Sequence, residues 1–243
     1  MNNSFSSEII TDKVVFISGA GSGIGRATSL LLAQAGAKVF SLDINEKGLE
    51  ETLELMPADS FGYVTGSVAD EHDVKKAFAE CRSKFGAIDV LLNNAGLGIP
   101  TPDLENFDMA VYHKMIDVNM TGVLLCTREA LSDMKTTGKG HIITVISMAG
   151  QRSNPSAPLY CASKFGARGI NSGLADQVLK LGIKVTDINP GPVNSNYWGD
   201  REVPREKFLS VDDVANVVKM VLSTPDYVVI REINFDNINW LAK

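Results

Sequence analysis

The chain has 243 residues, of which 44% are hydrophobic and 21% are charged, and its net charge is −6 at pH 7. This length can bury a large core, and we expect one domain over residues 1–243. The acidic balance argues against a nucleic-acid partner or an anionic membrane surface. Apolar runs also stay shorter than the roughly 20 residues of a transmembrane helix, so we expect no membrane partner.

The ends of the chain and its cysteines indicate the compartment. Residues 1–11 are mostly polar and lack the pattern of a signal peptide, so we expect a flexible tail there. Cys81, Cys126 and Cys161 are scattered, with no C-x-x-C pair. This usage is typical of a reducing cytoplasm and argues against a disulfide framework or a metal site.

The stretch from Val14 to Gly36 predicts a strand, a glycine-rich turn and a helix. Its first residues are β-branched or aromatic, as in a strand buried on both faces. Glycines follow at positions 19, 21, 23 and 25. Backbone N–H groups and the positive end of the helix dipole face such a turn, and glycine lets a pyrophosphate approach the backbone. We therefore expect a dinucleotide site, although the spacing is not the common G-x-G-x-x-G.

The second strand, expected over residues 38–42, leads to Asp43. A carboxylate at this position can accept both hydroxyls of an adenosine ribose, and it repels a 2′-phosphate. Positions 22 and 44 are Ser and Ile, so neither supplies a cation for a 2′-phosphate. We expect NAD rather than NADP. The alternative is that Asp43 is only a solvated residue at the end of a strand.

Strands and helices alternate along the rest of the chain. Further strands are expected over residues 61–68, 88–92, 141–147, 184–188 and 227–235, with helices over 46–55, 74–85, 107–134, 160–181 and 211–222. The helical pattern of 107–134 is interrupted near 117–120. This alternation predicts an α/β fold with a doubly wound, seven-stranded parallel sheet of Rossmann type and helices on both faces. Ligands of such sheets bind beyond the carboxyl ends of the strands.

Tyr160 and Lys164 are four residues apart, so they share one face of the expected helix. A neighbouring ammonium lowers the pKa of a phenol, which can then pass a proton near neutral pH. Hydride transfer to a carbonyl needs such a proton donor. Tyr–Lys pairs are also common on helices without any catalytic role. Ser147, at the end of a strand 13 residues before Tyr160, supports the catalytic interpretation.

Several short motifs occur together in one order. They are Ser18-Gly19-x-x-x-Gly23-Ile24-Gly25, Asn93-Asn94-Ala95-Gly96, Asn119, Ser147, Tyr160-x-x-x-Lys164 and Asn189-Pro190-Gly191. Together they resemble the short-chain dehydrogenase/reductase family over residues 12 to 235. The resemblance implies an oxidoreductase that transfers a hydride between NAD(H) and a secondary alcohol or ketone. It also suggests a homotetramer or dimer that pairs through the helices near 107–134 and 160–181.

The resemblance assigns four catalytic roles. Tyr160 is the general acid/base, and Lys164 lowers the pKa of Tyr160 and binds the nicotinamide ribose. Ser147 holds the substrate oxygen, while Asn119 keeps a kink and a water that links Lys164 to solvent. The residues expected at the cofactor are Gly19, Ser22, Gly23, Ile24, Gly25, Asp43, Asn93, Ala95, Gly96, Tyr160, Lys164, Pro190, Gly191 and Val193.

Two positions depart from the family pattern. Ser67 stands where the family often has an Asp that bonds the adenine amine, and it is open whether Asp70 replaces that group. Ile146 takes the place of the first of two commonly paired serines, although Ser147 remains. Residues 194–209 are expected to form a substrate loop, in which Tyr197 and Trp198 either pack on an apolar substrate or seat the loop on the core.

Two other functions compete with this interpretation. A non-catalytic dinucleotide-binding or regulatory protein of the same fold needs no proton donor, so it leaves the set of Asn119, Ser147, Tyr160 and Lys164 without a use. A methyltransferase shares the glycine turn but gives no role to the Tyr–Lys pair. The three histidines, at 72, 113 and 141, lie outside the motifs and are expected to be structural or surface residues.

Overall fold

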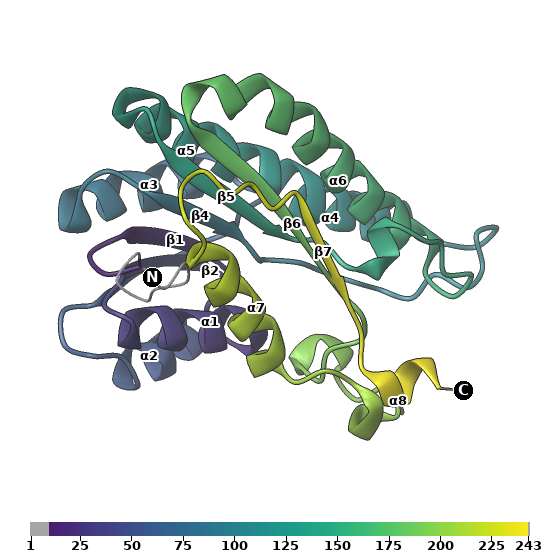
Figure 1. The fold of residues 1–243 in the computed structure, drawn as a ribbon. Helices are drawn as coiled ribbons and strands as arrows, with labels where there is room; N and C mark the ends of the chain where they lie inside the picture. Colours follow the sequence, from purple (N-terminus) through teal and green to yellow (C-terminus); the bar gives the residue numbers. More distant parts are fainter. Residues whose placement is uncertain (1–9, 243) are drawn as a thin grey trace.

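A computed structural model describes residues 10–242, and its seven strands form one sheet in the order β3-β2-β1-β4-β5-β6-β7 (Figure 1). Every neighbouring pair is parallel. The strands are β1 Val14–Ser18, β2 Lys38–Asp43, β3 Phe61–Thr65, β4 Val90–Asn93, β5 Gly140–Val145, β6 Ile183–Pro190 and β7 Glu232–Phe235. The predicted doubly wound parallel sheet is therefore confirmed.

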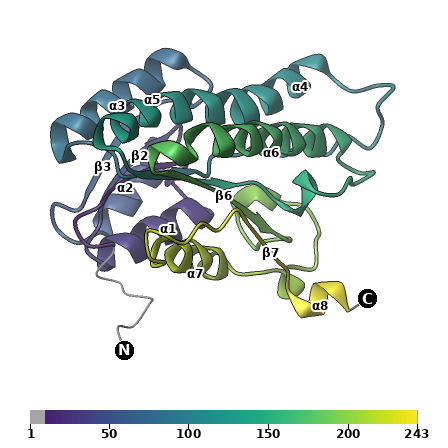
Figure 2. The ribbon, with the colours of Figure 1, turned by 45° about the horizontal axis from the view of Figure 1, so that its top comes forward.

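The helices cover both faces of this sheet. The α-helices are α1 Gly23–Gln34, α2 Glu46–Glu54, α3 Glu71–Phe85, α4 Met109–Ile116, α5 Gly122–Thr137, α6 Pro158–Val178, α7 Val211–Leu222 and α8 Ile238–Leu241. The shorter helical turns are the π-helix η2 Asp117–Thr121 and the 3₁₀ turns η3 Met148–Gly150, η4 Leu179–Leu181, η5 Asn196–Trp198 and η6 Arg205–Lys207. Figure 2 shows α3, α5 and α6 on one side of the sheet and α1 and α7 on the other.

Alternation along β1 explains the two layers. Val15 and Ile17 pack in one buried cluster with residues of α1, α2 and α7, whereas Val14 and Phe16 pack in a second cluster with residues of α3 and α5. Successive side chains of a strand point to opposite faces, so a strand that is apolar at every position is buried on both. All five residues of β1 are buried.

The strand order reverses beside β1. The chain builds β1, β2 and β3 outward in one direction and then returns to place β4 on the other side of β1. Because all strands are parallel, the loops after β1, β2, β4, β5 and β6 leave from the same edge. The crevice at such a reversal is the usual ligand site of open α/β sheets.

Several boundaries differ from the expectation; helix α3, for example, begins at Glu71 instead of residue 74. The last strand is only Glu232–Phe235 instead of 227–235, and Tyr227 is 85% exposed. The helix expected over 107–134 consists of three segments, which are α4, the π-helix η2 at the predicted interruption, and α5. The third strand ends at Thr65 rather than at residue 68.

One residue of the tail expected over residues 1–11 belongs to the core. The tail expected over 1–11 lies outside the described residues as far as residue 9, but Ile10 is only 1% exposed and belongs to the core. Among residues 10–242, none of the helices has the length and hydropathy to cross a bilayer.

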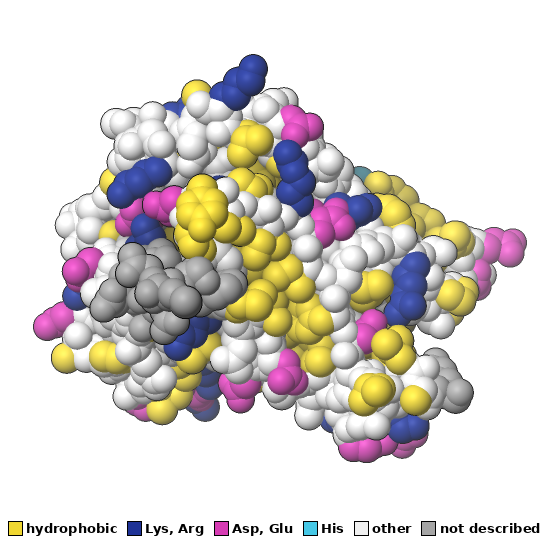
Figure 3. Space-filling model, viewed as in Figure 1, with side chains coloured by type: hydrophobic (Ala, Val, Ile, Leu, Met, Phe, Trp, Pro, Cys, Tyr) yellow, Lys and Arg dark blue, Asp and Glu magenta, His cyan; other side chains and the backbone are white. Residues whose placement is uncertain are grey.

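Hydrophobic side chains gather on the face where α7 and the segment before β7 lie (Figure 3), and Met220, Tyr227 and Val229 are exposed.

Candidate active site

A cavity of about 1110 Å³ opens at the carboxyl ends of the strands. It brings together most of the residues expected from the sequence, from five different loops and from α6. Those that line it are Gly19, Ser22, Gly23, Ile24, Asp43, Ala95, Gly96, Ser147, Tyr160, Lys164, Pro190, Gly191 and Val193. Gly25, Asn93 and Asn119 were expected at the ligand but do not line the cavity.

The glycine turn is shaped for close approach to an anion. Gly19 and Gly23 have φ angles of 79° and 54°, in the left-handed region that favours glycine. Ser22 precedes α1, and within residues 10–242 its side chain makes no capping hydrogen bond. The first N–H groups of α1 are therefore left for a ligand at the positive end of the helix dipole.

Gly25 and Asn93 make packing contacts within the fold. A Cβ on Gly25 would collide with the carbonyl oxygen of Gly19, so only glycine lets α1 pack this closely on the turn. The Asn93 side chain is buried and donates to the hydroxyl of Thr127, at 3.2 Å. The Asn93 amide thus points toward α5 rather than the cavity, and its expected contact with the cofactor stays a prediction.

Ser18 and Asn94 belong to the sequence motifs but were not among the expected site residues, and they position the glycine turn. The Asn94 amide donates to the carbonyl oxygens of Ser18 and Gly19, at 3.0 and 2.9 Å. The Ser18 hydroxyl accepts from the backbone N–H groups of Asn94 and Ala95. These four bonds hold the glycine turn against the end of β4. The adjacent asparagines at the end of that strand were the available signal.

Asp43 is held in place by the same turn. Its carboxylate accepts from the N–H of Gly21 at 2.8 Å and from the N–H of Asn45 at 2.9 Å. The guanidinium of Arg26 is held by Gly48, Glu51 and the side chain of Thr52. The cation nearest to the turn in the sequence is thus engaged by α2.

Ser147 follows β5 with a strained backbone. Its φ and ψ are 151° and 160°, a conformation found almost only in glycine. Its hydroxyl accepts from the N–H of Ala149 at 3.1 Å, and Ser147 lines the same cavity as Tyr160. Such strain persists only where surrounding contacts enforce it, and it clusters at functional sites.

The pKa of Tyr160 moves in the direction opposite to the one expected. Burial and the neighbouring Tyr197 raise the pKa of the Tyr160 phenol well above its usual value, whereas Ser147 lowers it. The ammonium of Lys164 lies 5.9 Å from the centre of the Tyr160 ring and donates to the carbonyl oxygen of Val145 at 3.0 Å. Burial lowers the pKa of Lys164 to about 8, and Asp187 opposes that shift.

Asn119 lies behind the cavity, in the π-helix. Its side chain accepts from the N–H of Leu97 at 2.8 Å and donates to the carbonyl oxygen of Leu97 at 2.7 Å. It also donates to the hydroxyl of Ser163 on α6, at 2.9 Å. A Cβ built on Gly96 would lie 3.5 Å from the Lys164 ammonium and 3.6 Å from the Asn119 oxygen. Asn119 therefore positions the loop after β4 beside Lys164.

Comparison with known proteins identifies the family of this chain. A family model described as short chain dehydrogenase matches residues 13–205. The chain belongs to this family. An uncharacterized oxidoreductase of Staphylococcus aureus strain USA300 is 32% identical over 225 residues, which cover 93% of this chain and 97% of that protein.

Two solved structures of oxidoreductases are similar over nearly the whole chain. One is an alcohol dehydrogenase from the archaeon Thermococcus sibiricus complexed with 5-hydroxy-NADP (28% identity, TM-score 0.86, 93% of this chain and 97% of that one). The other is a 3-ketoacyl-(acyl-carrier-protein) reductase from Brucella melitensis complexed with NADH (27% identity, TM-score 0.88, 95% and 99%). This short-chain dehydrogenase is thus an oxidoreductase of a family that binds nicotinamide dinucleotides, and its glycine turn fits such a group.

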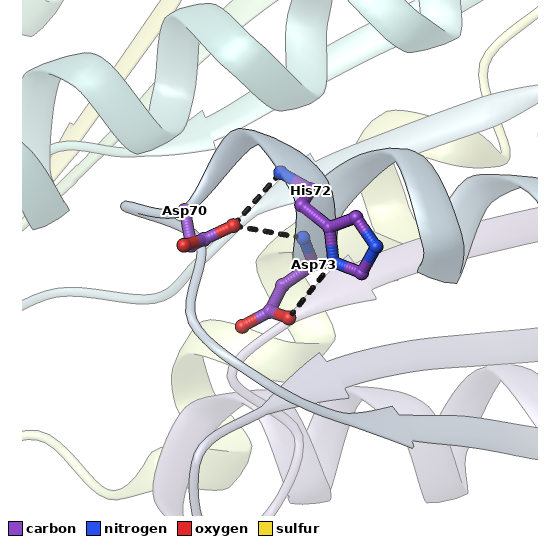
Figure 4. Close-up of side chains that lie close together, drawn as sticks. All are labelled: Asp70, His72 and Asp73. Atoms are coloured by element: carbon purple, nitrogen blue, oxygen red, sulfur yellow. Dashed lines mark hydrogen bonds and ion pairs between the residues drawn. The ribbon is translucent and has the colours of Figure 1, made fainter.

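The sequence leaves open whether Asp70 takes the place of the family's adenine-binding acid, and Figure 4 shows Asp70 at the start of α3, beside His72 and Asp73. Asp70 accepts from the N–H groups of His72 and Asp73, which caps α3. Asp73 in turn accepts from the N–H of Ser67 at 2.9 Å. Ser67 lines the cavity but Asp70 does not, so the dehydrogenase offers a hydroxyl and backbone groups at this end.

The loop after β6 brings a second tyrosine to the catalytic one. Tyr197, in η5, packs against Tyr160, with the two ring centres 5.7 Å apart. Trp198 packs on Phe208, which packs on Trp240 of α8. The sequence predicted a substrate loop and left open whether Tyr197 and Trp198 pack on the substrate or seat the loop, but it gave no signal that Tyr197 packs against Tyr160.

Proposed function

We propose that this short-chain dehydrogenase transfers a hydride between NAD(H) and a secondary alcohol or ketone, with Tyr160 as the general acid/base. The observation that carries this proposal is that Ser147, Tyr160 and Lys164 line the same cavity as the glycine turn. The turn that would bind the phosphates and the group that would transfer the proton then lie at two ends of one cavity. The same arrangement argues against a non-catalytic dinucleotide-binding protein, which needs no proton donor.

The chain's own groups manage the proton and the substrate oxygen. A bound nicotinamide supplies or accepts the hydride. Ser147 donates a hydrogen bond to the substrate oxygen, and Tyr160 gives it a proton when an alkoxide develops, or removes one in the reverse direction. Lys164 and Asn119 stand behind Tyr160, where Lys164 supplies positive charge that favours the phenolate.

NAD is the proposed cofactor, and Asp43 supports this preference. Its carboxylate borders the cavity, is fixed by Gly21 and Asn45, and presents negative charge where a 2′-phosphate would lie. Arg26 donates to Thr52 and Gly48 of α2 and to the carbonyl oxygen of Gly21, so its guanidinium is held by these bonds. A fluorescence titration with NADH and NADPH tests this, because preferred NADPH binding would contradict the role of Asp43.

Further proposals concern the location, the oligomeric state and the domain organisation of the protein. Free, buried Cys81, Cys126 and Cys161 are consistent with a reducing, cytoplasmic location. Exposed Leu124 on α5 and Phe165 on α6 favour a homodimer or homotetramer through these helices. Light scattering in solution measures the oligomeric state directly.

We also propose that the chain acts as a single catalytic domain, with a loop over 194–209 above the substrate.

The catalytic role is tested with Tyr160→Phe. Ketones and secondary alcohols are first screened with NADH and NAD, and the best substrate is then used for kinetics. The variant keeps the ring and loses the proton donor, so we expect turnover to fall about 10³-fold, within the range of general acid–base catalysis. The NADH dissociation constant should stay within about twofold. Tyr227→Phe, at an exposed site, is the matched control, and full turnover by Tyr160→Phe would refute the assignment.

A further inference from the structure

The wall of the cavity carries more positive than negative charge. Among the described residues that line it, the cations are Lys114, Arg152, Lys164 and Arg201, and the single acid is Asp43. The whole chain has a net charge of −6, so this excess of cations belongs to the cavity and not to the protein in general. A cleft lined by one sign of charge concentrates ligands of the opposite sign.

Arg152 lies in the same compact turn as Ser147. Its backbone N–H donates to the carbonyl oxygen of Met148 at 3.0 Å, and the N–H of Gly150 donates to that of Ser147 at 2.9 Å. Its side chain is 58% exposed, and within residues 10–242 its guanidinium makes no hydrogen bond. A guanidinium has five N–H donors, so Arg152 can offer several of them to a ligand in the cavity.

The guanidinium of Arg201 is used differently. It donates to the carbonyl oxygen of Trp198 at 2.7 Å and also to that of Tyr197, and it lies 5.0 Å from the ring centres of both. These contacts fix η5 and leave Arg201 little freedom to follow a ligand. Lys114 is exposed on α4 and adds a single ammonium. Arg152 is thus the guanidinium of the cavity whose donors are not already bound.

Asp236 holds the Arg152 side chain at the cavity wall. One oxygen of its carboxylate lies 3.7 Å from Nη2 of Arg152. The other oxygen, Oδ1, is buried and has no hydrogen-bond partner in the described part of the chain. A Cβ on Gly191 would collide with this oxygen, so Asp236 lies against the loop after β6. Because Asp236 does not line the cavity, it orients Arg152 without adding negative charge to the wall.

The strand order separates this guanidinium from the glycine turn. The turn follows β1, whereas Gly191 follows β6 and Asp236 follows β7. Strands lie about 4.8 Å apart, so these ends are about 14–19 Å from the end of β1. Helix α8, which starts two residues after Asp236, adds Trp240 and Leu241 to the cavity wall. Arg152 therefore lies at the substrate end, too far away to serve a pyrophosphate on the turn.

We propose that Arg152 is a specificity-determining residue that binds a carboxylate of the substrate, so that this short-chain dehydrogenase acts on short hydroxy acids and oxo acids. The inference rests on the proposed function, because that function places the reacting carbon at Tyr160. The N–H groups of a guanidinium match the two oxygens of a carboxylate. Arg152 follows Ser147 by five residues in a compact turn, so one small molecule can reach both side chains.

The first test compares acids with their neutral esters. Racemic 2-hydroxybutyrate, 3-hydroxybutyrate and 4-hydroxypentanoate are each assayed with NAD beside the corresponding methyl ester. A hydrogen bond to a charged group changes an equilibrium constant about ten- to a hundredfold. We therefore expect kcat/KM of the best acid to exceed that of its ester at least about tenfold. A smaller ratio at all three chain lengths overturns the proposal.

Variants then locate the preference at Arg152. Arg152→Gln should lower kcat/KM for the acid about ten- to a hundredfold more than for the ester, and Arg152→Lys, which keeps the charge, should restore part of the difference. Arg128→Gln removes a cation from the exposed face of α5, outside the cavity, and is the matched control. Equal losses for acid and ester in Arg152→Gln contradict a carboxylate contact at this residue.

A binding measurement needs no turnover and separates the two proposals. Ligand-observed NMR follows butyrate and butanamide, which have no hydroxyl to oxidise, on the complex with NADH. Butyrate should bind to wild type and to Tyr160→Phe, and at least about tenfold more weakly to Arg152→Gln; butanamide should distinguish none of them. Butyrate that fails to bind wild type, or binds Arg152→Gln equally well, overturns the role of Arg152. Retained turnover in Tyr160→Phe, or a wild type that turns over neither acidic nor neutral alcohols and ketones, would instead overturn the proposed function.

Discussion

The backbone of Ser147 ties local strain to the chemistry of the site. Its positive φ occurs at the end of a buried strand segment, where its hydroxyl accepts from the N–H of Ala149 and Ser147 lines the same cavity as Tyr160. A non-glycine residue in this region costs about 1–3 kcal/mol of folding free energy. Under the proposed function, this strained backbone turns the serine hydroxyl toward the reacting oxygen. Stability and activity therefore make opposite demands on this position.

Two substitutions at Ser147 separate these demands. Ser147→Ala and Ser147→Gly both remove the hydroxyl, so we expect each to lower kcat about 10²-fold, as for the loss of one donor at a developing oxyanion. Glycine also relieves the strain, so Ser147→Gly should be more stable to urea than Ser147→Ala by about 1–2 kcal/mol. Equal midpoints for the two variants would show that the backbone of Ser147 is not strained.

The local spacing of Tyr160 and Lys164 could be predicted from the sequence, but their electrostatics could not. Helical periodicity puts both on one face whatever surrounds them. The direction of the Tyr160 pKa depends on burial and on Tyr197, which is 37 residues further along the chain. Lys164 gives a bond to Val145, on a strand that precedes it. No local pattern reports such contacts, because they come from the way loops close over the sheet.

At the scale of elements, the break between α4 and α5 adapts the helix to the site. The π-helix η2 puts Asn119 toward Leu97 and Ser163, and α5 then starts at Gly122. A Cβ on Gly122 would lie 2.7 Å from a methyl carbon of Val68, which lines the cavity. The start of α5 is thus packed directly against the loop after β3, which lines the cavity.

We predict opposite effects for alanine at two helical glycines. Gly122→Ala forces a methyl group against the β-branched side chain of Val68, and such overpacking costs about 1–3 kcal/mol. Gly173 on α6 is exposed and has nothing within 4 Å of an added Cβ. Gly173→Ala should therefore stabilise the protein by about 0.5–1 kcal/mol through helix propensity alone. Thermal unfolding measures both, and a stabilised Gly122→Ala would contradict this account of the packing.

The sequence predicted the interiors of elements better than their ends. Helix α7 has the expected bounds, because Ser210 and Asp213 form a capping box that is visible as a local motif. Strand β7 starts later than expected, since β propensity from Tyr227 onward does not reveal where pairing with β6 begins. The π-helix was visible only as an interruption. Its conformation depends on Asn119 bonding Leu97, a contact across 22 residues.

At the scale of the whole molecule, buried ionisable groups on neighbouring strands respond to pH in opposite directions. Burial lowers the pKa of His141 on β5 to about 3, with Lys184 and Lys13 adding repulsion. Burial raises the pKa of Asp187 on β6 to about 6, although Asn171 donates to it at 2.6 Å. Below about pH 6.5 the unfolded state takes up the His141 proton and gains relative stability. Asp187 has the opposite sign between its ordinary pKa of 3.8 and about 6, because there the folded state holds more protons.

Replacing His141 by Gln isolates its contribution to the pH dependence of stability from that of Asp187. Its Nε2 lies 2.8 Å from the hydroxyl of Thr186, which donates to the carbonyl oxygen of Ile230, so the neutral ring donates to Thr186. Gln at position 141 can keep that bond without titrating. Between about pH 6 and pH 4, wild type should lose stability relative to His141→Gln by about 1.4 kcal/mol per pH unit, since only its unfolded state binds the extra proton. Asp187 is unchanged in both proteins and cancels. Urea unfolding at pH 7, 6, 5 and 4 checks this, with His113→Gln, at an exposed site, as the control; parallel stability curves for wild type and His141→Gln would mean that His141 already titrates in the folded protein.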